Sequence, residues 1–214
     1  MRPLVLAHRA RQGHRHPENS LAALRAVLRG RTDGVEIDVR RSSDGAYFIH
    51  HDPAFADGTP VESLSAQGLR KRKLSNGEPI PTLEDFLRAA TRGLVFLDLK
   101  ETCLPVEVAD RALRVLPPER LFFSSFWHPG IRELGRRHPT LRRGVTLEAR
   151  LVAPEKAMTE AGASVLVLPA SCADRTTVTA VRKAGGEVWC WGFRSGDATS
   201  RALAKRGVSC LIPD

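Results

Sequence analysis

Acidic residues in two short, otherwise apolar segments have a spacing suited to chemistry. One segment is Val-Glu-Ile-Asp-Val, with Glu36 and Asp38, and the other is Leu-Asp-Leu-Lys, with Asp98 and Lys100. Alternate side chains of a β-strand share a face, so Glu36 and Asp38 would lie together, as would Asp98 and Lys100. Buried carboxylates repel one another unless a cation or a proton lies between them. The three carboxylates therefore predict an all-oxygen site for Mg²⁺ or Ca²⁺, with salt-bridged strand ends as the alternative.

Two histidines and an arginine also follow apolar segments directly. His8 and Arg9 come after Leu4–Ala7, and His51 comes after Ala46–His50. Histidine transfers protons near neutral pH, while arginine and lysine neutralise a phosphate. Next to a divalent cation, these side chains and Lys100 are the parts that phosphoryl transfer needs. A single histidine is more often structural, so the prediction depends on the whole set.

The elements that must position these residues alternate along the chain. Apolar runs typical of strands are separated by segments with helical periodicity, such as Ser20–Leu28 and Pro105–Leu116. The predicted strands are Leu4–Ala7, Gly34–Val39, Leu94–Leu99, Leu121–Ser124, Gly144–Leu147, Ser164–Leu168, Glu187–Trp191 and Ser209–Ile212. This alternation predicts an α/β fold, a (β/α)₈ TIM barrel with its active site at the C-terminal ends of the strands. A doubly wound open sheet is the competing architecture, although no glycine-rich phosphate loop follows the first strand.

One further apolar run, Ala46–His50, does not fit the alternation. It follows the second strand after only a few residues, which end in Asp44-Gly45. A parallel neighbour needs a crossover of about a dozen residues, whereas Asp-Gly favours a hairpin. We therefore predict an antiparallel hairpin excursion outside the barrel, which folds His51 and Asp52 back over its mouth.

Composition narrows the class of protein. The chain has 214 residues, of which 42% are hydrophobic and 27% charged, as in ordinary globular domains, and we predict a single barrel domain over residues 1–214. No apolar run has the length of about 20 residues that a membrane-spanning helix needs. The first residues do not resemble a secretory signal, so we expect a cytoplasmic protein. Four scattered cysteines without metal spacing predict buried free thiols.

The charge favours anionic partners of several kinds. The net charge is +9, which suits a phosphate ester, an acidic lipid or a nucleic acid. Nucleic acid is not expected as a partner, because no basic helix carries interleaved aromatic residues and only 6% of the residues are aromatic. A small-molecule phosphodiester is the expected substrate.

The order of these residues also resembles that of a known enzyme family. The motifs are His8-Arg9-Ala10, Pro17-Glu18-Asn19-Ser20, Glu36-Ile37-Asp38-Val39, Asp44-Gly45, His51-Asp52, Ile80-Pro81-Thr82-Leu83-Glu84, Leu97-Asp98-Leu99-Lys100, Ser125-Phe126, Val188-Trp189-Cys190-Trp191 and Ile212-Pro213-Asp214. Their order and approximate spacing are similar to those of the glycerophosphodiester phosphodiesterase family, within the phospholipase C-like TIM-barrel phosphodiesterases. The similarity extends over almost the whole chain.

The resemblance implies metal-dependent hydrolysis of glycerophosphodiesters to an alcohol and glycerol 3-phosphate. A substrate hydroxyl would attack phosphorus to give a cyclic phosphate, which water then opens. His8 is assigned as the base and His51 as the acid of the first step, with the roles exchanged in the second. The matching positions are the metal ligands Glu36, Asp38 and Asp98, the acid–base pair His8 and His51, the phosphate-contacting Arg9 and Lys100, and the pocket-lining Trp191.

Departures from the family pattern leave the substrate open. Asp98 stands where the third ligand is usually glutamate, Ala10 replaces a glycine, and the segment between Asp52 and Ile80 is shorter than the usual cap. Related phospholipase D enzymes of the spider-toxin type also have Asp-x-Lys here. Cleavage of lysophospholipid or sphingomyelin head groups, with transient lipid contact, is therefore an alternative. A catalytically silent barrel that binds anions or nucleic acid is the alternative from a different class. The sequence does not indicate the native metal, the leaving alcohol or the oligomeric state.

Overall fold

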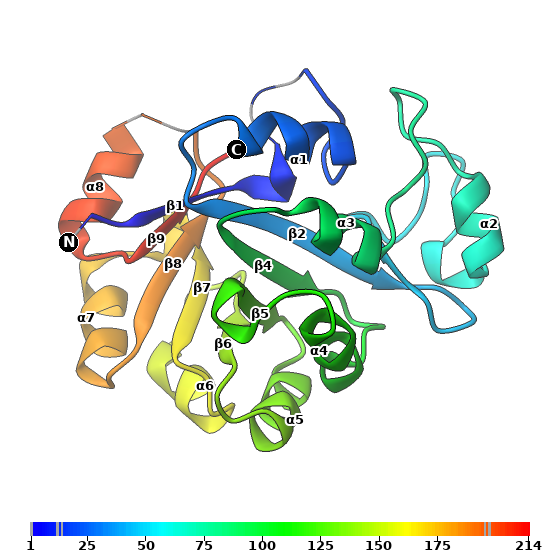
Figure 1. The fold of residues 1–214 in the computed structure, drawn as a ribbon. Coiled ribbons are helices and arrows are strands. Elements are labelled where there is room, and N and C mark those ends of the chain that lie inside the picture. Colours follow the sequence, from blue (N-terminus) through cyan, green and yellow to red (C-terminus); the bar gives the residue numbers. More distant parts are fainter. Residues whose placement is uncertain (1, 12, 14, 195, 197) are drawn as a thin grey trace.

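The chain folds into a closed barrel of parallel strands (Figure 1). The computed structural model describes residues 2–11, 13, 15–194, 196 and 198–214. In this part of the chain eight parallel strands follow one another in the order β1-β9-β8-β7-β6-β5-β4-β2, and β1 pairs with β2 to close the ring. The strands are β1 (Leu4–Ala7), β2 (Gly34–Arg41), β4 (Leu94–Leu99), β5 (Leu121–Ser125), β6 (Arg142–Thr146), β7 (Val165–Pro169), β8 (Glu187–Trp191) and β9 (Cys210–Ile212). The predicted (β/α)₈ barrel is confirmed, with strand ends shifted by at most two residues.

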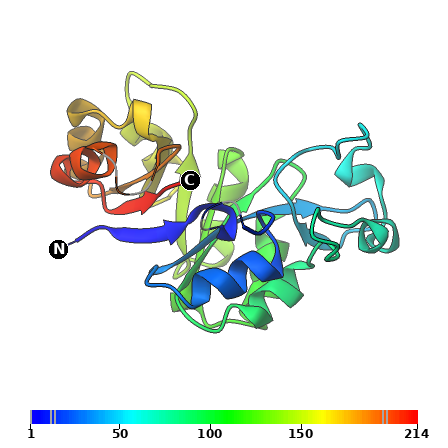
Figure 2. The same ribbon diagram turned by 90° about the horizontal axis from the view of Figure 1, so that it is seen from above.

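Helices in the connections cover the outside of the barrel (Figures 1 and 2). They are α1 (Leu21–Leu28), α3 (Leu83–Ala89), α4 (Pro105–Leu113), α5 (His128–Arg137), α6 (Pro154–Glu160), α7 (Arg175–Lys183) and α8 (Ala198–Arg206), with short 3₁₀ turns at η1 (His8–Ala10), η3 (Pro118–Arg120) and η4 (Ala170–Cys172). Side chains in the sequence fix several helix starts. Ser20, Thr82 and Asp174 each accept a hydrogen bond from a backbone N–H in the first turn of the helix that follows.

The strands separate an outer core from an inner one. Val35, Ile37 and Val39 point outward and pack in the same cluster as residues of α1 and α3. In the barrel interior, Phe96, Phe122 and Trp189 belong to a second cluster, in which the rings of Phe122 and Trp189 stack. The strand period of two, which the sequence predicts for the outward Val35, Ile37 and Val39, is therefore confirmed. At the C-terminal ends of the strands, inward-facing positions outside this inner cluster can therefore carry polar side chains.

The predicted excursion is present beside the barrel. Strand β3 (Tyr47–Ile49) pairs antiparallel with β2 outside the ring. Together with η2 (Val61–Ser63) and α2 (Ala66–Lys71) it forms an arm, cyan in Figures 1 and 2, on one side of the molecule. The arm has its own small core, with Phe48, Val61, Leu69 and Ile80. Because β3 turns back along β2, it delivers His51 to the barrel mouth.

Two other expectations concern the cysteines and membrane-spanning helices. Cys103, Cys172, Cys190 and Cys210 are buried free thiols, as predicted. Among the described residues, no helix combines the length and apolar character needed to cross a membrane.

Candidate active site at the barrel mouth

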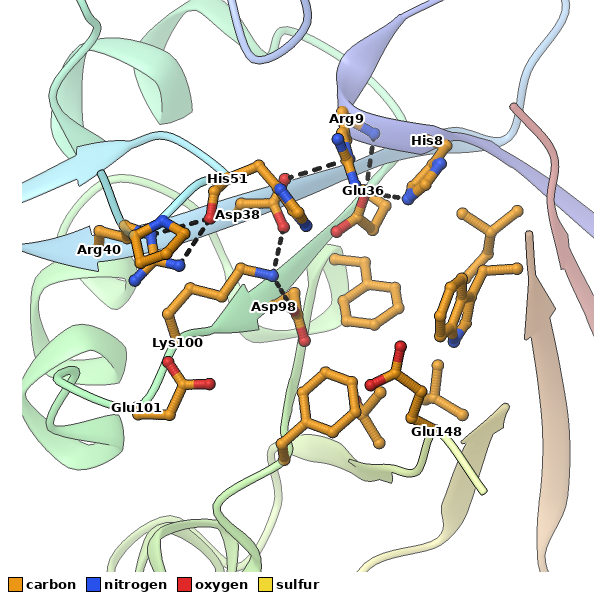
Figure 3. Close-up of a pocket in the computed structure, with 17 residues that line it drawn as sticks. His8, Arg9, Glu36, Asp38, Arg40, His51, Asp98, Lys100, Glu101 and Glu148 are labelled. Atoms are coloured by element: carbon orange, nitrogen blue, oxygen red, sulfur yellow. Dashed lines mark hydrogen bonds and ion pairs between the residues drawn. The ribbon is translucent and has the colours of Figure 1, made fainter. Parts of the chain in front are cut away.

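A cavity of about 460 Å³ opens at the C-terminal ends of the strands (Figure 3). All predicted site residues line it, namely His8, Arg9, Glu36, Asp38, His51, Asp98, Lys100 and Trp191. They come from five connections or strands that lie far apart in the sequence. The structure thus brings the predicted set together in one place, as the barrel geometry requires.

The three predicted metal ligands form one buried cluster. Glu36 and Asp38 lie on β2 and Asp98 lies opposite Asp38 on β4. One carboxylate oxygen from each residue lies within 4.8 Å of those from the other two. Nζ of Lys100 lies 2.6 Å from an oxygen of Asp38 and 2.6 Å from an oxygen of Asp98, so this ammonium offsets part of the negative charge.

The electrostatics of this cluster leave negative charge uncompensated. Burial, and then the charges of Asp38 and Asp98, raise the pKa of Glu36 well above its usual range. Burial also raises the pKa of Asp98, against the opposing charge of Lys100. At Asp38 burial acts in the same direction, but the charges of Lys100 and His51 and the hydrogen bonds of its carboxylate lower its pKa to about 2. One ammonium therefore does not balance three carboxylates.

The oxygen chemistry of the cluster fits a divalent cation. Oδ1 of Asp98 is buried and has no hydrogen-bond partner among the described residues. Burying an acceptor without a partner is unfavourable, and a hard cation would satisfy it. Three carboxylates from two neighbouring strands are also the donor set that Mg²⁺ and Ca²⁺ prefer.

His8 is held by a carboxylate from the other end of the chain. Its Nδ1 lies 2.5 Å from Oδ1 of Asp214, while its Nε2 faces the cluster, 3.9 Å from Oε2 of Glu36. Burial and the charge of Arg9 lower the pKa of His8, and Asp214 partly opposes them. The neutral imidazole with a proton on Nδ1 would leave Nε2 free to accept a proton.

His51 has a comparable partner and a fixed backbone. Its Nδ1 lies 2.8 Å from Oδ1 of Asp52, so its Nε2 is the nitrogen left for the cavity. The buried guanidinium of Arg40 donates two hydrogen bonds, of 2.9 and 2.7 Å, to the carbonyl oxygen of His51. Arg40 therefore fixes the arm to the barrel at the point where His51 enters the site (Figure 3).

The loop after β1 contacts the carboxylates through its backbone and an amide. The backbone N–H of Arg9 donates to Oε2 of Glu36 at 2.7 Å, and Nδ2 of Asn19 donates to Asp38 at 2.8 Å. The Arg9 guanidinium pairs with Glu18 at 2.9 Å and lies 3.8 Å from Asp38. Arg9, Ala10 and Asn19 all have positive φ, between 50° and 56°. This costs energy for side chains other than glycine, and here it turns the loop toward the ligands.

The opposite wall of the cavity is mostly neutral. Its lining includes Phe126, Val167 and Trp191. The carboxylate of Glu148 also lies on this side (Figure 3). Nε1 of Trp191 is buried without a hydrogen-bond partner among the described residues, so it is available to a bound molecule. The predicted pocket-lining position of Trp191 agrees with this arrangement.

Sequence reasoning did not assign a role to Asp214, Arg40 or Glu148. Asp214 and His8 are separated by 206 residues, and only barrel closure brings them together. Arg40 and Glu148 were detectable in principle, because Arg40 continues the inward alternation of Glu36 and Asp38, and Glu148 is two residues beyond the inward Thr146.

Comparison with known proteins identifies relatives with one shared description. The sequence model of the "Glycerophosphoryl diester phosphodiesterase family" matches residues 8–214. "Probable glycerophosphodiester phosphodiesterase 2" of Mycobacterium tuberculosis is 36% identical over 101 residues, which are 45% of this chain and 38% of that protein. "Glycerophosphodiester phosphodiesterase" of Caldanaerobacter subterraneus is 28% identical over 173 residues, which are 72% of this chain and 70% of that protein.

A solved structure has the same fold. It is an Oleispira antarctica phosphodiesterase in complex with the product sn-glycerol-3-phosphate. The TM-score is 0.89 with 24% sequence identity, over 99% of this chain and 93% of that chain. At this identity the likeness concerns the barrel itself.

Proposed function

This chain belongs to the glycerophosphoryl diester phosphodiesterase family, and on that premise we propose that it hydrolyses glycerophosphodiesters to an alcohol and glycerol 3-phosphate. The observation that carries the proposal is the convergence of two imidazoles and three buried carboxylates on one cavity. The relatives named as glycerophosphodiester phosphodiesterases support it. The product bound to the Oleispira antarctica protein supports glycerol 3-phosphate as one product.

A divalent cation completes the site in this proposal. Glu36, Asp38 and Asp98 would hold Mg²⁺ or Ca²⁺, because their oxygens form the only cluster of this kind in the described part of the chain. A bound cation would supply Lewis-acid stabilisation of the phosphate charge. Because Asp98 is shorter than glutamate by one methylene, a cation that it binds would lie closer to the backbone of β4. Asn19 and the backbone N–H of Arg9 orient Asp38 and Glu36.

The two histidines move the protons of the reaction. Nε2 of His8 accepts the proton of a glycerol hydroxyl, whose oxygen then bonds to phosphorus. The phosphorus–oxygen bond to the alcohol breaks, and Nε2 of His51 donates the proton that the leaving oxygen needs. Water reverses these roles and opens the cyclic phosphate. Asp214 and Asp52 hold the two imidazoles by their Nδ1 atoms, which leaves both Nε2 atoms for the substrate.

The remaining predicted residues bind and orient the substrate. Arg9 and Lys100 provide positive charge beside the carboxylates, where phosphate oxygens would bind. Trp191 presents an indole N–H and an aromatic face on the neutral wall. These positions favour a phosphodiester whose anionic centre faces Lys100 and whose alcohol groups extend toward the wall.

A substrate panel tests the proposal. Purified protein with Mg²⁺ or Ca²⁺ is expected to release glycerol 3-phosphate from glycerophosphocholine, glycerophosphoethanolamine or glycerophosphoinositol, as measured with glycerol-3-phosphate dehydrogenase. Chelation with EDTA should abolish this, and ³¹P NMR should detect the cyclic phosphate before it is opened. Lysophosphatidylcholine and sphingomyelin in the same panel test head-group cleavage. Equal rates with and without EDTA, or no turnover of any member, would contradict the proposal.

A further inference from the structure

The large apolar side chains that the barrel exposes are confined to one part of its mouth. In the described residues they are Leu104 at 44%, Phe126 at 39%, Trp127 at 40%, Leu151 at 43% and Val152 at 107% exposure. They lie on the three successive loops after β4, β5 and β6, at the end of the barrel where the cavity opens. Single exposed apolar residues are ordinary, but their restriction to one edge points to a contact surface. We call these five residues the apolar rim.

The apolar rim continues into the cavity. Phe126 is exposed at the surface and also lines the pocket. Trp127 packs close to Gly130 and Pro105, since a Cβ added at Gly130 would lie 2.5 Å from the Trp127 ring and 2.9 Å from Pro105. Pro105 directly follows Leu104, so the loops after β4 and β5 present adjoining apolar side chains. The strands β4, β5 and β6 are hydrogen-bonded neighbours, which places the third loop next in the row.

The loop after β6 combines a hydrogen-bonded arginine with an exposed apolar segment. Arg150 donates a hydrogen bond to the carbonyl oxygen of Ser171 at 2.5 Å and lies 4.0 Å from the carboxylate of Asp174. The next two residues, Leu151 and Val152, are exposed, and Val152 has no cover at all. In Figure 2 this yellow-green loop projects at the edge of the molecule. The exposed pair therefore directly follows an arginine that is hydrogen-bonded to the loop after β7.

A phospholipid surface fits this arrangement better than a second copy of the chain. A protein seated on the apolar rim would contact Phe126 and cover the opening of the cavity without supplying a substrate. A lipid surface instead presents phosphodiesters and apolar chains side by side. The net charge of +9 favours an anionic surface. Apolar residues next to a basic side chain are also typical of segments that lie at the boundary of head groups and acyl chains.

We propose that the apolar rim docks the barrel mouth on an anionic phospholipid surface, with Leu151 and Val152 entering the boundary between head groups and acyl chains. Docking brings the cavity to phosphodiesters at or near that surface. The inference goes beyond the proposed function, and it rests on that function only for the identity of the group that the cavity receives. Binding to lipid and hydrolysis of a soluble substrate can therefore be measured separately.

Vesicle co-sedimentation tests the proposal. The wild-type protein is expected to bind vesicles of phosphatidylcholine with phosphatidylglycerol and to bind phosphatidylcholine alone less well. The double variant Leu151→Ser with Val152→Ser should lose about tenfold or more in partition coefficient, because two apolar side chains no longer enter the boundary. High salt should weaken wild-type binding without abolishing it. Hydrolysis of soluble glycerophosphocholine by the variant should equal that of the wild type.

Ala149→Ser is the matched control, since Ala149 is exposed on the same loop and carries no large apolar group. It should bind vesicles like the wild type, and thermal melting should show both variants folded. Absence of wild-type binding, or equal binding by the double variant, would overturn the proposal. A wild-type dimer that the double variant dissociates would assign the rim to a second copy instead. A failure to hydrolyse glycerophosphocholine without vesicles would count against the proposed function alone.

Discussion

The two halves of the barrel mouth follow the same strand alternation but hold different kinds of side chain. On β2 and β4 and directly after β1, the positions that line the mouth carry ionisable groups, among them His8, Glu36 and Asp98. On β6, β7 and β8 the corresponding positions carry Thr146, Val167 and Trp191. Figure 3 shows the ion pairs and hydrogen bonds concentrated on the first half.

The charged half holds the groups that can react, whereas the neutral half determines the shape of the cavity. In the neutral half a buried hydroxyl is satisfied locally, as in the 2.8 Å hydrogen bond between Ser124 and Thr146. In the charged half Lys100 is shared between Asp38 and Asp98, and burial, together with the charges of these two carboxylates, raises the pKa of Glu36. In the proposed function the charged half would gain a cation and a phosphate, and its buried charges would lower the stability of the free protein. The neutral half provides the walls of the cavity and leads to the apolar rim.

Substituting one glutamate in each half gives the sharpest test of this comparison. Glu36→Gln removes a buried carboxylate from the cluster and should lower kcat by about a thousandfold, because the transition-state charge loses its organised cation. Glu148→Gln makes the same chemical change at the exposed edge of the neutral wall and should alter kcat by only a few-fold. Steady-state kinetics on glycerophosphocholine measure both. Equal losses in the two variants would show that the division into halves is wrong.

The carboxylate partners of the two histidines should differ in importance. Asp214→Asn should reduce kcat by roughly 10- to 100-fold, as for other groups that orient a catalytic residue. Asp52→Asn should cost less, since the side chain of Asp52 is 66% exposed, against 45% for Asp214, and water can replace it more easily. Because Asp214 raises the pKa of His8, its loss should also move the acidic limb of the kcat/KM profile to lower pH. A larger effect of Asp52→Asn would reverse the comparison.

The charged half was also the more predictable one from sequence. Glu36, Asp38 and Asp98 could be placed on one face because a strand alternates with a period of two, and the barrel then determines which end they occupy. The hairpin that carries His51 followed from Asp44-Gly45. The contact between His8 and Asp214 and the bonds from Arg40 to His51 could not be predicted, because they depend on how strand ends meet across the closed ring. The apolar rim was missed because exposure of a loop residue has no periodic signature.

Stability should respond to Glu36→Gln in the direction opposite to activity. The pKa of Glu36 is raised above 4.5 in the folded protein, so its contribution to stability is present below pH 4.5 and is lost as pH rises through the folded pKa. In the presence of a chelator, the free energy of unfolding of the variant should therefore exceed that of the wild type by roughly 1–3 kcal/mol. This gap should grow as the pH rises from 4.5.

Urea unfolding at several pH values measures this gap. Adding Mg²⁺ or Ca²⁺ at about 1,000 times its Kd should reverse the sign of this gap, because the cation then stabilises the wild type by about 4.1 kcal/mol. Glu148→Gln should show neither the pH-dependent gap nor the reversal, since its carboxylate is exposed. A gap that does not change with pH would disprove the assignment of the effect to Glu36 ionisation.

The smallest expected effect concerns the backbone of the charged half, at Ala10. Among the described residues, positive φ outside glycine is confined to Arg9, Ala10 and Asn19, in the loop that contacts Glu36 and Asp38. Ala10→Gly should relieve about 1 kcal/mol of strain and lose about 0.8 kcal/mol from its buried methyl group, so the free energy of unfolding should hardly change. Ala26→Gly, in the last turn of α1, should instead destabilise by up to about 1 kcal/mol, because helical φ gives glycine no advantage. If both substitutions destabilise equally by thermal melting, the loop stores no strain, and its contacts with the carboxylates are made without that cost.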